Sequence, residues 1–241
     1  MVPVISAPPA TRNFQRGIAL LYEDRDILVV NKPAGLLTIA SDSEKTRTAY
    51  FILTDYARKG RSKSRNRIFI VHRLDRETSG ILIFAKTIEA KLYLQQHWEA
   101  TEKKYLAVVH GRMKKKTEII STYLAENKAH MVYSTSDRSK GRLARTAYRV
   151  LEQTKDFALL EVDLLTGRKH QIRVHLAENG HPVVGDTKYG KENRGHRNLA
   201  LHACSLSVTH PVTGERLTFE AAAPAYFSQL MGELRIRRRS N

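Results

Sequence analysis

The sequence predicts an α+β fold in which a mixed, mostly antiparallel β-sheet forms the core and helices flank it. About seven short runs of β-branched and aromatic residues are bounded by turn residues, and helical patterns stand between some of them. The helical patterns do not alternate regularly with the strands, as a parallel sheet with crossover helices would require. No internal repeat of fixed period occurs in the 241 residues.

Residues 18–86 contain three predicted strands and one predicted helix. Residues 27–30 form a short apolar run that ends at Asn31-Lys32-Pro33-Ala34-Gly35, where proline and glycine favour a turn. Residues 48–56 have a helical pattern. Residues 68–71 and 80–85 are apolar runs typical of buried strands, and the segment between them has turn chemistry.

From residue 87 onward, the predicted strands, turns and helices alternate less regularly. Thr87 is a suitable N-cap for a helix over 88–100, and Gly180 ends a helix predicted over 170–179. Residues 112–146 are polar, and we expect a hairpin or a long loop there. The remaining predicted elements are strands at 103–111, 147–152, 158–165, 199–208 and 216–222, and a final helix at 226–237.

No break in composition separates two domains. Residues 1–17 are rich in proline and predict a flexible arm, with regular structure beginning near Ile18. We expect a single catalytic domain over residues 18–234. Residues 235–241 predict a mobile basic tail.

The chain is strongly basic, with 41 Lys and Arg against 24 Asp and Glu and a formal charge of +17. Such an excess indicates a polyanionic partner, with nucleic acid the first candidate and an anionic membrane surface the second. No apolar run approaches the roughly 18–20 residues of a membrane span, and no signal peptide is recognisable. Cys204 is the single cysteine, which fits a reducing compartment; we therefore expect a cytoplasmic protein.

The segment from Val71 to Gly80 is the most informative part of the chain, because it places Asp75 between two arginines. Neighbouring cations favour the ionised form of a carboxylate. Catalytic groups are often carried on loops between rigid elements, and the predicted strands on both sides give Asp75 that position.

Three other segments contain candidate functional residues, each with an ordinary structural alternative. Tyr105 is either a functional ring or a plain strand aromatic. Arg173 follows a turn-to-helix junction suited to anions, although periodicity alone also allows a helix-surface charge. The basic run 58–67, with Arg61, Lys63 and Arg65, is either a solvated loop tip or a loop that contacts phosphates.

Several chemistries find no support in the sequence. There is no Gly-x-x-x-x-Gly-Lys-Ser/Thr loop and no Gly-x-Gly-x-x-Gly, so the usual nucleotide-binding loops are missing. No His-Glu-x-x-His occurs, and the spacing of His170 and His175 does not suit a helical metal site. We expect neither a metal nor a cofactor.

The motif around Asp75 resembles the central motif of the RluA-type pseudouridine synthases, and further motifs follow in the same order as in that family. The resemblance covers roughly residues 18–225. The matching segments are Asn31-Lys32-Pro33-Ala34-Gly35, His72-Arg73-Leu74-Asp75 with Thr78-Ser79-Gly80 and Ala85-Lys86, Lys104–Gly111, Thr166–His175, Gly180–Asp186 and Leu201-His202-Ala203.

The resemblance implies a role for each matching residue. Asp75 would be the catalytic aspartate, and Arg73 would engage the RNA backbone and hold the target nucleotide out of its stack. Tyr105 would stack on the flipped uracil, and Arg173 would pair with Asp75. Weaker candidates for substrate contact or loop support are Lys32, His72, Thr78, Arg168 and His170.

The resemblance also implies the fold, a pseudouridine synthase fold with a central RNA-binding cleft, and the reaction. The glycosidic bond of a uridine breaks, the uracil rotates, and C5 rejoins C1′ without a cofactor. The expected partner is ribosomal or transfer RNA with a stem-loop uridine, bound by a monomer, with no DNA and no membrane. Residues 1–17 are too short for the S4-type RNA-binding module of some relatives. The alternative is a non-catalytic RNA-binding or ribosome-assembly protein on the same scaffold.

Overall fold

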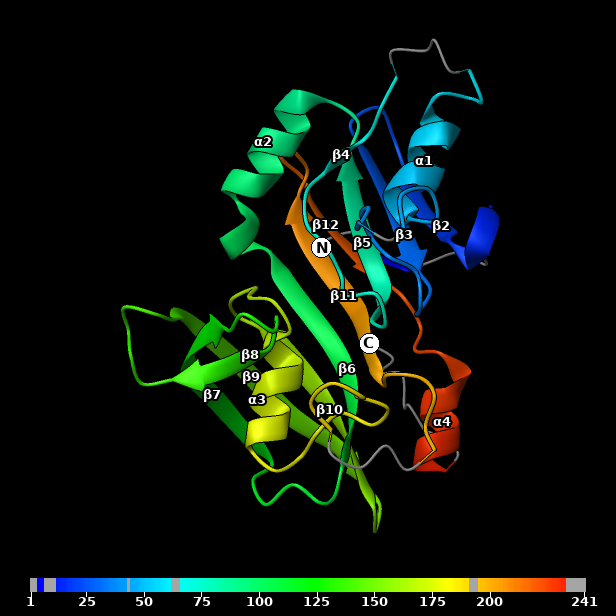
Figure 1. Cartoon of the computed structure of the whole chain (residues 1–241). Helices are drawn as coiled ribbons and strands as arrows, with labels where there is room; N and C mark the ends of the chain where they lie inside the picture. The colour runs from blue at the N-terminus through cyan, green and yellow to red at the C-terminus, as the bar shows by residue number, and fades with distance from the viewer. Residues whose placement is uncertain (1–3, 7–11, 43, 62–65, 191–194, 233–241) are drawn as a thin grey trace. The chain divides into compact units, whose positions relative to one another are not determined.

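The computed structural model describes residues 4–6, 12–42, 44–61, 66–190 and 195–232 (Figure 1). The chain divides into two compact units. Unit 1 comprises residues 1–105 and 201–222, and unit 2 comprises residues 106–200 and 223–241.

Unit 1 contains a mixed sheet whose pairs are mostly antiparallel. Its strands are β1 (Val4–Ser6), β2 (Ala19–Glu23), β3 (Ile27–Lys32), β4 (Phe69–Ile70), β5 (Ser79–Ala85), β11 (Leu201–Thr209) and β12 (Arg216–Glu220). The order β2-β3-β5-β11 forms its centre, β12 continues from β11, and β1 pairs with β12. The pairs β5–β11 and β1–β12 are parallel, and the other pairs in this unit are antiparallel.

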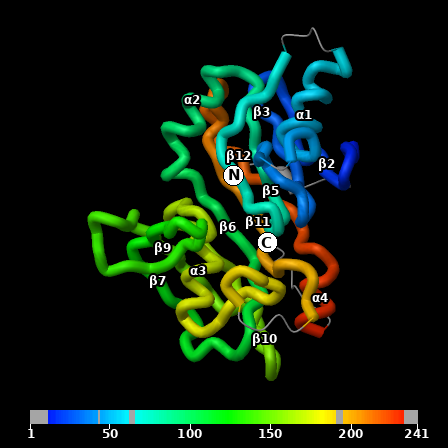
Figure 2. Tube along the Cα trace, viewed as in Figure 1, coloured from blue at the N-terminus to red at the C-terminus, as the bar shows by residue number. Residues whose placement is uncertain are grey.

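Strand β5 is the central strand of this sheet, and all seven of its residues are buried. It lies beside β3 along its whole length, as Figures 1 and 2 both show. Its other edge is shared: Ala85 and Phe84 pair with β4, whereas Gly80 and Ser79 pair with β11. The segment between β4 and β5 therefore leaves the sheet and returns to it along this edge.

Close approach of two backbones explains the glycine in β5. Gly80 has a φ of +116°, and a Cβ there would lie 2.3 Å from the carbonyl oxygen of Ala203 on β11. Only glycine fits such a position without displacing the neighbouring strand.

Two helices and two short 3-10 turns complete the described part of unit 1. In α1 (Ala49–Ala57) the Thr48 hydroxyl caps the first turn, and in α2 (Ile88–Gln96) Thr87 does the same. The helix predicted over 88–100 is thus confirmed up to Gln96, and Trp98–Ala100 form a 3-10 turn. A second 3-10 turn, Gln15–Gly17, precedes β2.

Unit 2 is an antiparallel sheet with two helices. Strand β6 (Glu102–His110) begins in unit 1 and continues into unit 2, where the order is β6-β10-β9-β7-β8. Helix α3 lies against β9 (Figure 2). The elements are β7 (Thr117–Glu126), β8 (Val132–Thr135), β9 (Arg142–Gln153), β10 (Phe157–Leu164), α3 (Gln171–Glu178) and α4 (Ala225–Met231).

The α+β class is confirmed, and several boundaries are corrected. Residues 112–146, expected as a hairpin or long loop, contain the antiparallel hairpin of β7 and β8, and also the start of β9. The last helix begins at Ala225 and ends at Met231. Regular structure begins before Ile18, with β1 and the 3-10 turn.

Some predictions concern residues outside the described part of the chain. These are Lys63, Arg65 and the tail 235–241. The single domain over 18–234 stays a prediction. None of the described helices combines the length and the apolar character needed to cross a membrane.

Candidate active site

Residues 71–78, the Asp75 loop, connect β4 to β5 without regular structure, as the sequence predicted. The loop starts beside the part of β5 that pairs with neither β4 nor β11. There the His72 Nε2 accepts a hydrogen bond from the backbone N–H of Ile83 at 3.2 Å. The His72 ring also stacks on Trp98, with 4.4 Å between ring centroids. Burial and the nearby Lys103 charge lower the pKa of His72 to about 3. A neutral imidazole can accept this bond, so His72 supports the loop.

The backbone beside Asp75 is held from the segment that follows β3. The Thr38 hydroxyl donates to the Leu74 carbonyl at 2.8 Å and accepts the Leu74 N–H at 3.2 Å. On the other side, the N–H of buried Thr78 donates to the Asp75 carbonyl at 3.2 Å. Asp75 therefore occupies a tight turn, and its half-buried side chain is anchored through its own backbone.

Lys32 connects the first motif to the Asp75 loop. Its ammonium is completely buried and donates to the carbonyls of Pro33 at 2.9 Å, Leu36 at 2.8 Å and Arg76 at 3.2 Å. Burial lowers the pKa of Lys32 to about 7, although the carboxylates of Glu77 and Asp75 act in the opposite direction. Of the two roles expected for Lys32, this burial favours loop support, because a contact with RNA requires an exposed ammonium.

The two arginines that flank Asp75 are exposed. Arg76 Nε donates to the Gly35 carbonyl at 3.2 Å, and the Gly35 N–H donates to the Arg76 carbonyl at 2.8 Å. Arg76 thereby completes the clamp that Lys32 begins. Arg73 is exposed, as is Arg61, and their contacts with RNA stay predictions.

Tyr105 lies in unit 1 at the start of β6, with 9% of its surface exposed. Burial raises the pKa of the Tyr105 hydroxyl, and the Asp75 carboxylate raises it further. The Asp75 carboxylate therefore acts electrostatically on the Tyr105 hydroxyl, which stays protonated at neutral pH. Stacking of the Tyr105 ring on a flipped base stays a prediction.

In unit 2, Arg173 forms a buried ion pair that the sequence did not reveal. Its Nε and Nη2 donate to the two carboxylate oxygens of Asp186, both at 2.8 Å. The guanidinium also lies over the Tyr189 ring, 5.3 Å from its centroid. Burial alone would raise the pKa of Asp186, but the bonds from Arg173 and from the backbone N–H groups of Tyr189 and Lys188 outweigh it and lower the pKa. Arg173 is therefore oriented by Asp186, and its pairing with Asp75 stays a prediction.

The other candidates in unit 2 support the start of α3. His170 has a left-handed backbone with a φ of 52°, and its Nδ1 lies 2.7 Å from the Tyr189 hydroxyl. Arg168 Nε donates to the Leu143 carbonyl at 3.1 Å. The buried Gln171 accepts the Arg168 N–H at 3.0 Å. These contacts shape the turn before Arg173.

One group of the described residues has side chains in a metal-like arrangement, namely Asp24, Asp26 and His210. The Asp24 carboxylate already accepts bonds from the backbone of Asp26 and Ile27, both at 2.7 Å. It also accepts from the Tyr22 hydroxyl at 2.8 Å and lies 2.9 Å from His210 Nε2. Asp24 and His210 therefore stabilise the turn between β2 and β3, and these bonds engage both carboxylate oxygens of Asp24.

Together these features describe a basic α+β protein with a clamped Asp75 loop and a neighbouring tyrosine, and its basic surface is typical of proteins that bind nucleic acid. The family model described as RNA pseudouridylate synthase matches residues 26–178. The chain belongs to this family, whose enzymes isomerise uridine to pseudouridine in RNA.

Curated relatives agree with the family assignment. "Uncharacterized RNA pseudouridine synthase YlyB" of Bacillus subtilis is 38% identical over 220 residues, which cover 90% of this chain and 72% of the relative. "Ribosomal large subunit pseudouridine synthase D" of Nitrosomonas europaea is 34% identical over 229 residues, covering 90% and 65%.

Solved structures confirm the fold. "Human RNA Pseudouridylate Synthase Domain Containing 1" matches with a TM-score of 0.70 and 26% identity, over 89% of this chain and 86% of that chain. "Human RNA Pseudouridylate Synthase Domain Containing 4" matches with a TM-score of 0.75 and 24% identity, over 94% of each chain.

Proposed function

We propose that Asp75 is the catalytic group with which this enzyme converts specific uridines of ribosomal RNA to pseudouridine. The observation that carries this proposal is the Asp75 loop itself. Its backbone is held by Thr38 and Lys32, and its carboxylate interacts with the neighbouring Tyr105. Pre-positioning of this kind lowers the cost of bringing a reacting group to its target.

The reaction is an isomerisation and needs no redox partner. The bond between C1′ and N1 of the uridine breaks, and a bond between C1′ and C5 forms. The proton on C5 is released, and N1 takes up a proton. Asp75 would act at the ribose or the base in this exchange, so we expect the enzyme to need no cofactor and no metal.

The neighbouring residues would handle the extruded nucleotide. Removing a base from its stack costs a few kcal/mol, which stacking on an aromatic ring, worth about 1–3 kcal/mol, can offset. Tyr105 has a neutral ring beside Asp75 and is suited to this. Exposed Arg73 would contact the RNA backbone next to the target.

Arg173 would complete the site as a cation oriented by Asp186. Two nitrogens of its guanidinium are engaged by Asp186, which limits the directions in which the group can point. We propose that this fixed guanidinium pairs with Asp75, as the family resemblance implies. A double-mutant cycle of Asp75→Asn and Arg173→Gln on the free energy of unfolding tests the pairing, because residues in contact deviate from additivity.

Ribosomal RNA is the preferred substrate class, since relatives from several bacteria carry the name "Ribosomal large subunit pseudouridine synthase D". Transfer RNA is the second class to test. We further propose that the enzyme acts as a monomer in the cytoplasm, without DNA or membrane partners.

The Asp75→Asn variant tests the proposal directly. It should abolish release of tritium from C5-labelled uridine in RNA, while its affinity for RNA stays within about threefold of the wild type, because one uncharged replacement leaves the basic surface intact. Undiminished turnover of this variant would refute the role of Asp75. Loss of RNA binding together with turnover would instead indicate a folding defect, which thermal unfolding detects.

Variants of Tyr105 separate stacking from hydroxyl chemistry. Tyr105→Phe keeps the ring and should retain most of the turnover, whereas Tyr105→Ala should lose roughly 10- to 100-fold, in line with about 1–3 kcal/mol of stacking. Equal losses in both variants would show that the hydroxyl, and not the ring, is needed.

A further inference from the structure

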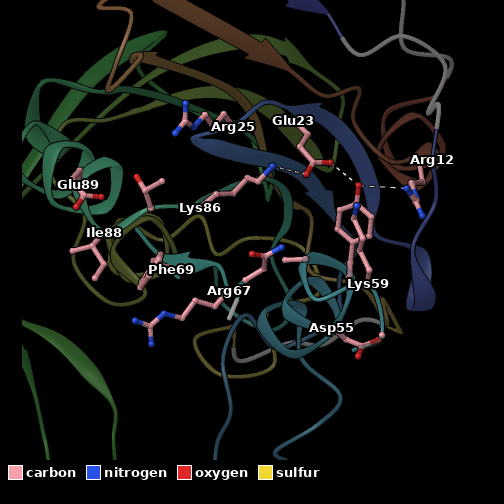
Figure 3. A pocket seen from close by; sticks show the side chains of 15 residues that line it. Arg12, Glu23, Arg25, Asp55, Lys59, Arg67, Phe69, Lys86, Ile88 and Glu89 are labelled. Atoms are coloured by element: carbon pink, nitrogen blue, oxygen red, sulfur yellow. Dashed lines mark hydrogen bonds and ion pairs between the residues drawn. The ribbon is translucent and has the colours of Figure 1, made fainter. Parts of the chain in front are cut away.

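A pocket with a volume of about 870 Å³ opens in unit 1, lined by residues from the β2–β3 turn, α1, the segment before β4, and the start of α2 (Figure 3). Its volume lies within the roughly 300–1,000 Å³ typical of small-molecule sites. The pocket is separate from the Asp75 loop. Asp75 precedes β5, whereas the pocket residue Lys86 follows β5. Seven residues of strand span about 20 Å, so about that distance separates the two sites.

One side of the pocket is internally neutralised. Lys86 pairs with Glu23 at 2.8 Å, the Tyr56 hydroxyl donates to the same carboxylate at 2.7 Å, and Arg12 donates to Tyr56 at 3.4 Å. Figure 3 shows this bonded series running from Lys86 through Glu23 to Arg12. These groups hold one another and need no ligand.

Other cations of the pocket have no such partner. Arg25, Lys59 and Arg67 are exposed, and none of them forms an ion pair with a carboxylate in the described part of the chain. Exposed cations that line a concavity and have no carboxylate partner are suited to phosphate groups, although Asp55 and Glu89 also line this pocket.

An aromatic ring stands beside these cations. Phe69 lines the pocket, with the Arg67 guanidinium 5.0 Å from its ring centroid. Figure 3 shows Phe69 next to exposed Ile88, away from the bonded series. The cations suit the phosphate of a nucleotide, and the aromatic ring suits its base. Every base has a flat π-face, so stacking on an aromatic ring tolerates any base.

We propose that this pocket is a second RNA-binding site, which takes a nucleotide of the substrate strand outside the target uridine, with its base on Phe69 and its phosphate near Arg25. This inference rests on the proposed RNA substrate and extends it. At roughly 3.4 Å per stacked nucleotide, about 20 Å corresponds to roughly six nucleotides from the target. Substrates that extend beyond this length should therefore bind more tightly than a minimal stem-loop.

The test compares a long RNA and a minimal stem-loop, with binding measured in the Asp75→Asn background so that no turnover occurs. Arg25→Gln should lower the slope of log affinity against log salt by about 0.7 for the long RNA only. Phe69→Leu should weaken long-RNA binding at least about fivefold, and Phe69→Tyr, which keeps the ring, should restore it. The exposed Lys155→Gln variant removes one charge in unit 2 and is the matched control.

With Asp75 intact, the Arg25→Gln and Phe69→Leu double variant should turn over the minimal stem-loop within about twofold of the wild-type rate. The second site would be refuted if Arg25→Gln and Phe69→Leu left the affinity for the long RNA unchanged. It would also be refuted if both RNAs lost affinity equally. Uridine monophosphate is the probe for the alternative source of the same chemistry. If it binds the pocket and long RNA does not compete with it, the site takes free nucleotides and the RNA proposal fails.

The two proposals fail separately. If the wild type forms no pseudouridine, the proposed function is refuted, yet the binding difference between long and short RNA is measured without turnover. If pseudouridine forms but the binding difference is missing, only the second site is refuted. Thermal unfolding of each variant identifies any loss caused by misfolding, since Phe69 also packs against the core of unit 1.

Discussion

Replacing Lys32 by methionine tests whether a buried ammonium organises the Asp75 loop. The two side chains have similar length, but methionine cannot donate to carbonyls. Lys32 is completely buried, and its three acceptors are the carbonyls of Pro33, Leu36 and Arg76. The substitution therefore removes the connection between the first motif and the loop while filling nearly the same volume.

The expected change in stability is small because two large contributions oppose each other. Three hydrogen bonds from a charged donor contribute about 1.5–3 kcal/mol each, or roughly 4–9 kcal/mol in total. The decrease in the pKa of Lys32 from 10.5 to about 7 corresponds to about 5 kcal/mol of unfavourable burial, which the variant avoids. We expect the free energy of unfolding at pH 7 to fall by roughly 0–4 kcal/mol.

The pH dependence is more diagnostic than the magnitude. Between pH 7 and 10.5 the unfolded chain keeps the Lys32 proton and the folded chain releases it, so the stability of the wild type rises with pH. Lys32 contributes up to about 1.4 kcal/mol per pH unit to this rise. The variant lacks this contribution, so the stability difference in favour of the wild type should grow as the pH increases.

Chemical denaturation at several pH values measures this difference, and tritium release measures activity. We expect kcat to fall roughly 10- to 100-fold, because a displacement of about 1 Å in a reacting group can cost a factor of that order. Lys155→Met, an exposed lysine, is the control for loss of charge alone. Parallel stability profiles for wild type and Lys32→Met would refute the depressed pKa, and an unchanged kcat would refute the role of the clamp.

Two further predictions follow from packing. Gly80→Ala should destabilise the protein by at least about 2 kcal/mol in thermal unfolding, because its Cβ would lie 2.3 Å from the Ala203 carbonyl oxygen. The control is Gly214→Ala, which is also at positive φ but has no atom near the added Cβ. It should cost only about 1–2 kcal/mol in the same assay. Similar losses in both would contradict the steric argument. Asp186→Asn should destabilise by about 3–5 kcal/mol by leaving the buried Arg173 without its counter-charge. Because folding lowers the pKa of Asp186, its contribution to the free energy of unfolding is present above the unfolded pKa of 3.8 and is lost as the pH falls below that value. Identical stability profiles for the wild type and the variant at acid pH would contradict this.

The position of Asp75 could be predicted from the sequence because the strands around it are strongly patterned. Residues 80–85 form an apolar run, and the structure buries every residue of β5. The short β4 precedes the loop, and turn residues stand between them. Local pattern is sufficient here because the loop directly precedes β5, the fully buried central strand of the sheet.

The partners of the site residues could not be predicted in this way. Thr38 is 36 positions from Leu74, and Asp186 is 13 positions from Arg173. Hydrogen bonds at such separations depend on the tertiary fold, and periodicity contains no information about them. The same limit hid the stack of His72 on Trp98, since nothing in the order of residues places these rings together.

The sequence allowed a hairpin at β7 but could not fix its strands, because the side-chain pattern of β7 is irregular. Ile119 is 56% exposed, whereas the adjacent Ile120 is 7% exposed and Thr, Ser and Glu occupy much of the rest. The strand is held by ladders to β9 on one side and β8 on the other. Pairing on both edges stabilises a strand whose side chains alone would not predict it.

The basic composition of the chain combines two populations of cations with different roles. Lys32, Lys103 and Arg173 are at most 8% exposed and bind carbonyls or a carboxylate inside the protein. Arg25 and Arg73 are exposed and are available to phosphates. Loss of activity after substitution therefore does not identify an RNA contact.

The dependence of RNA affinity on salt distinguishes these populations. An exposed cation that contacts a phosphate releases counterions, so its removal should lower the slope by about 0.7 for single strands. A buried cation contacts no phosphate, so its removal should reduce turnover and leave the slope unchanged. Lys32 and Arg73 both belong to the family motifs, but Lys32 is buried and Arg73 is exposed. The salt dependence of their variants therefore distinguishes positioning of the Asp75 loop from binding of RNA. A changed slope for Lys32→Met would show that this ammonium reaches RNA and that the division by burial is wrong.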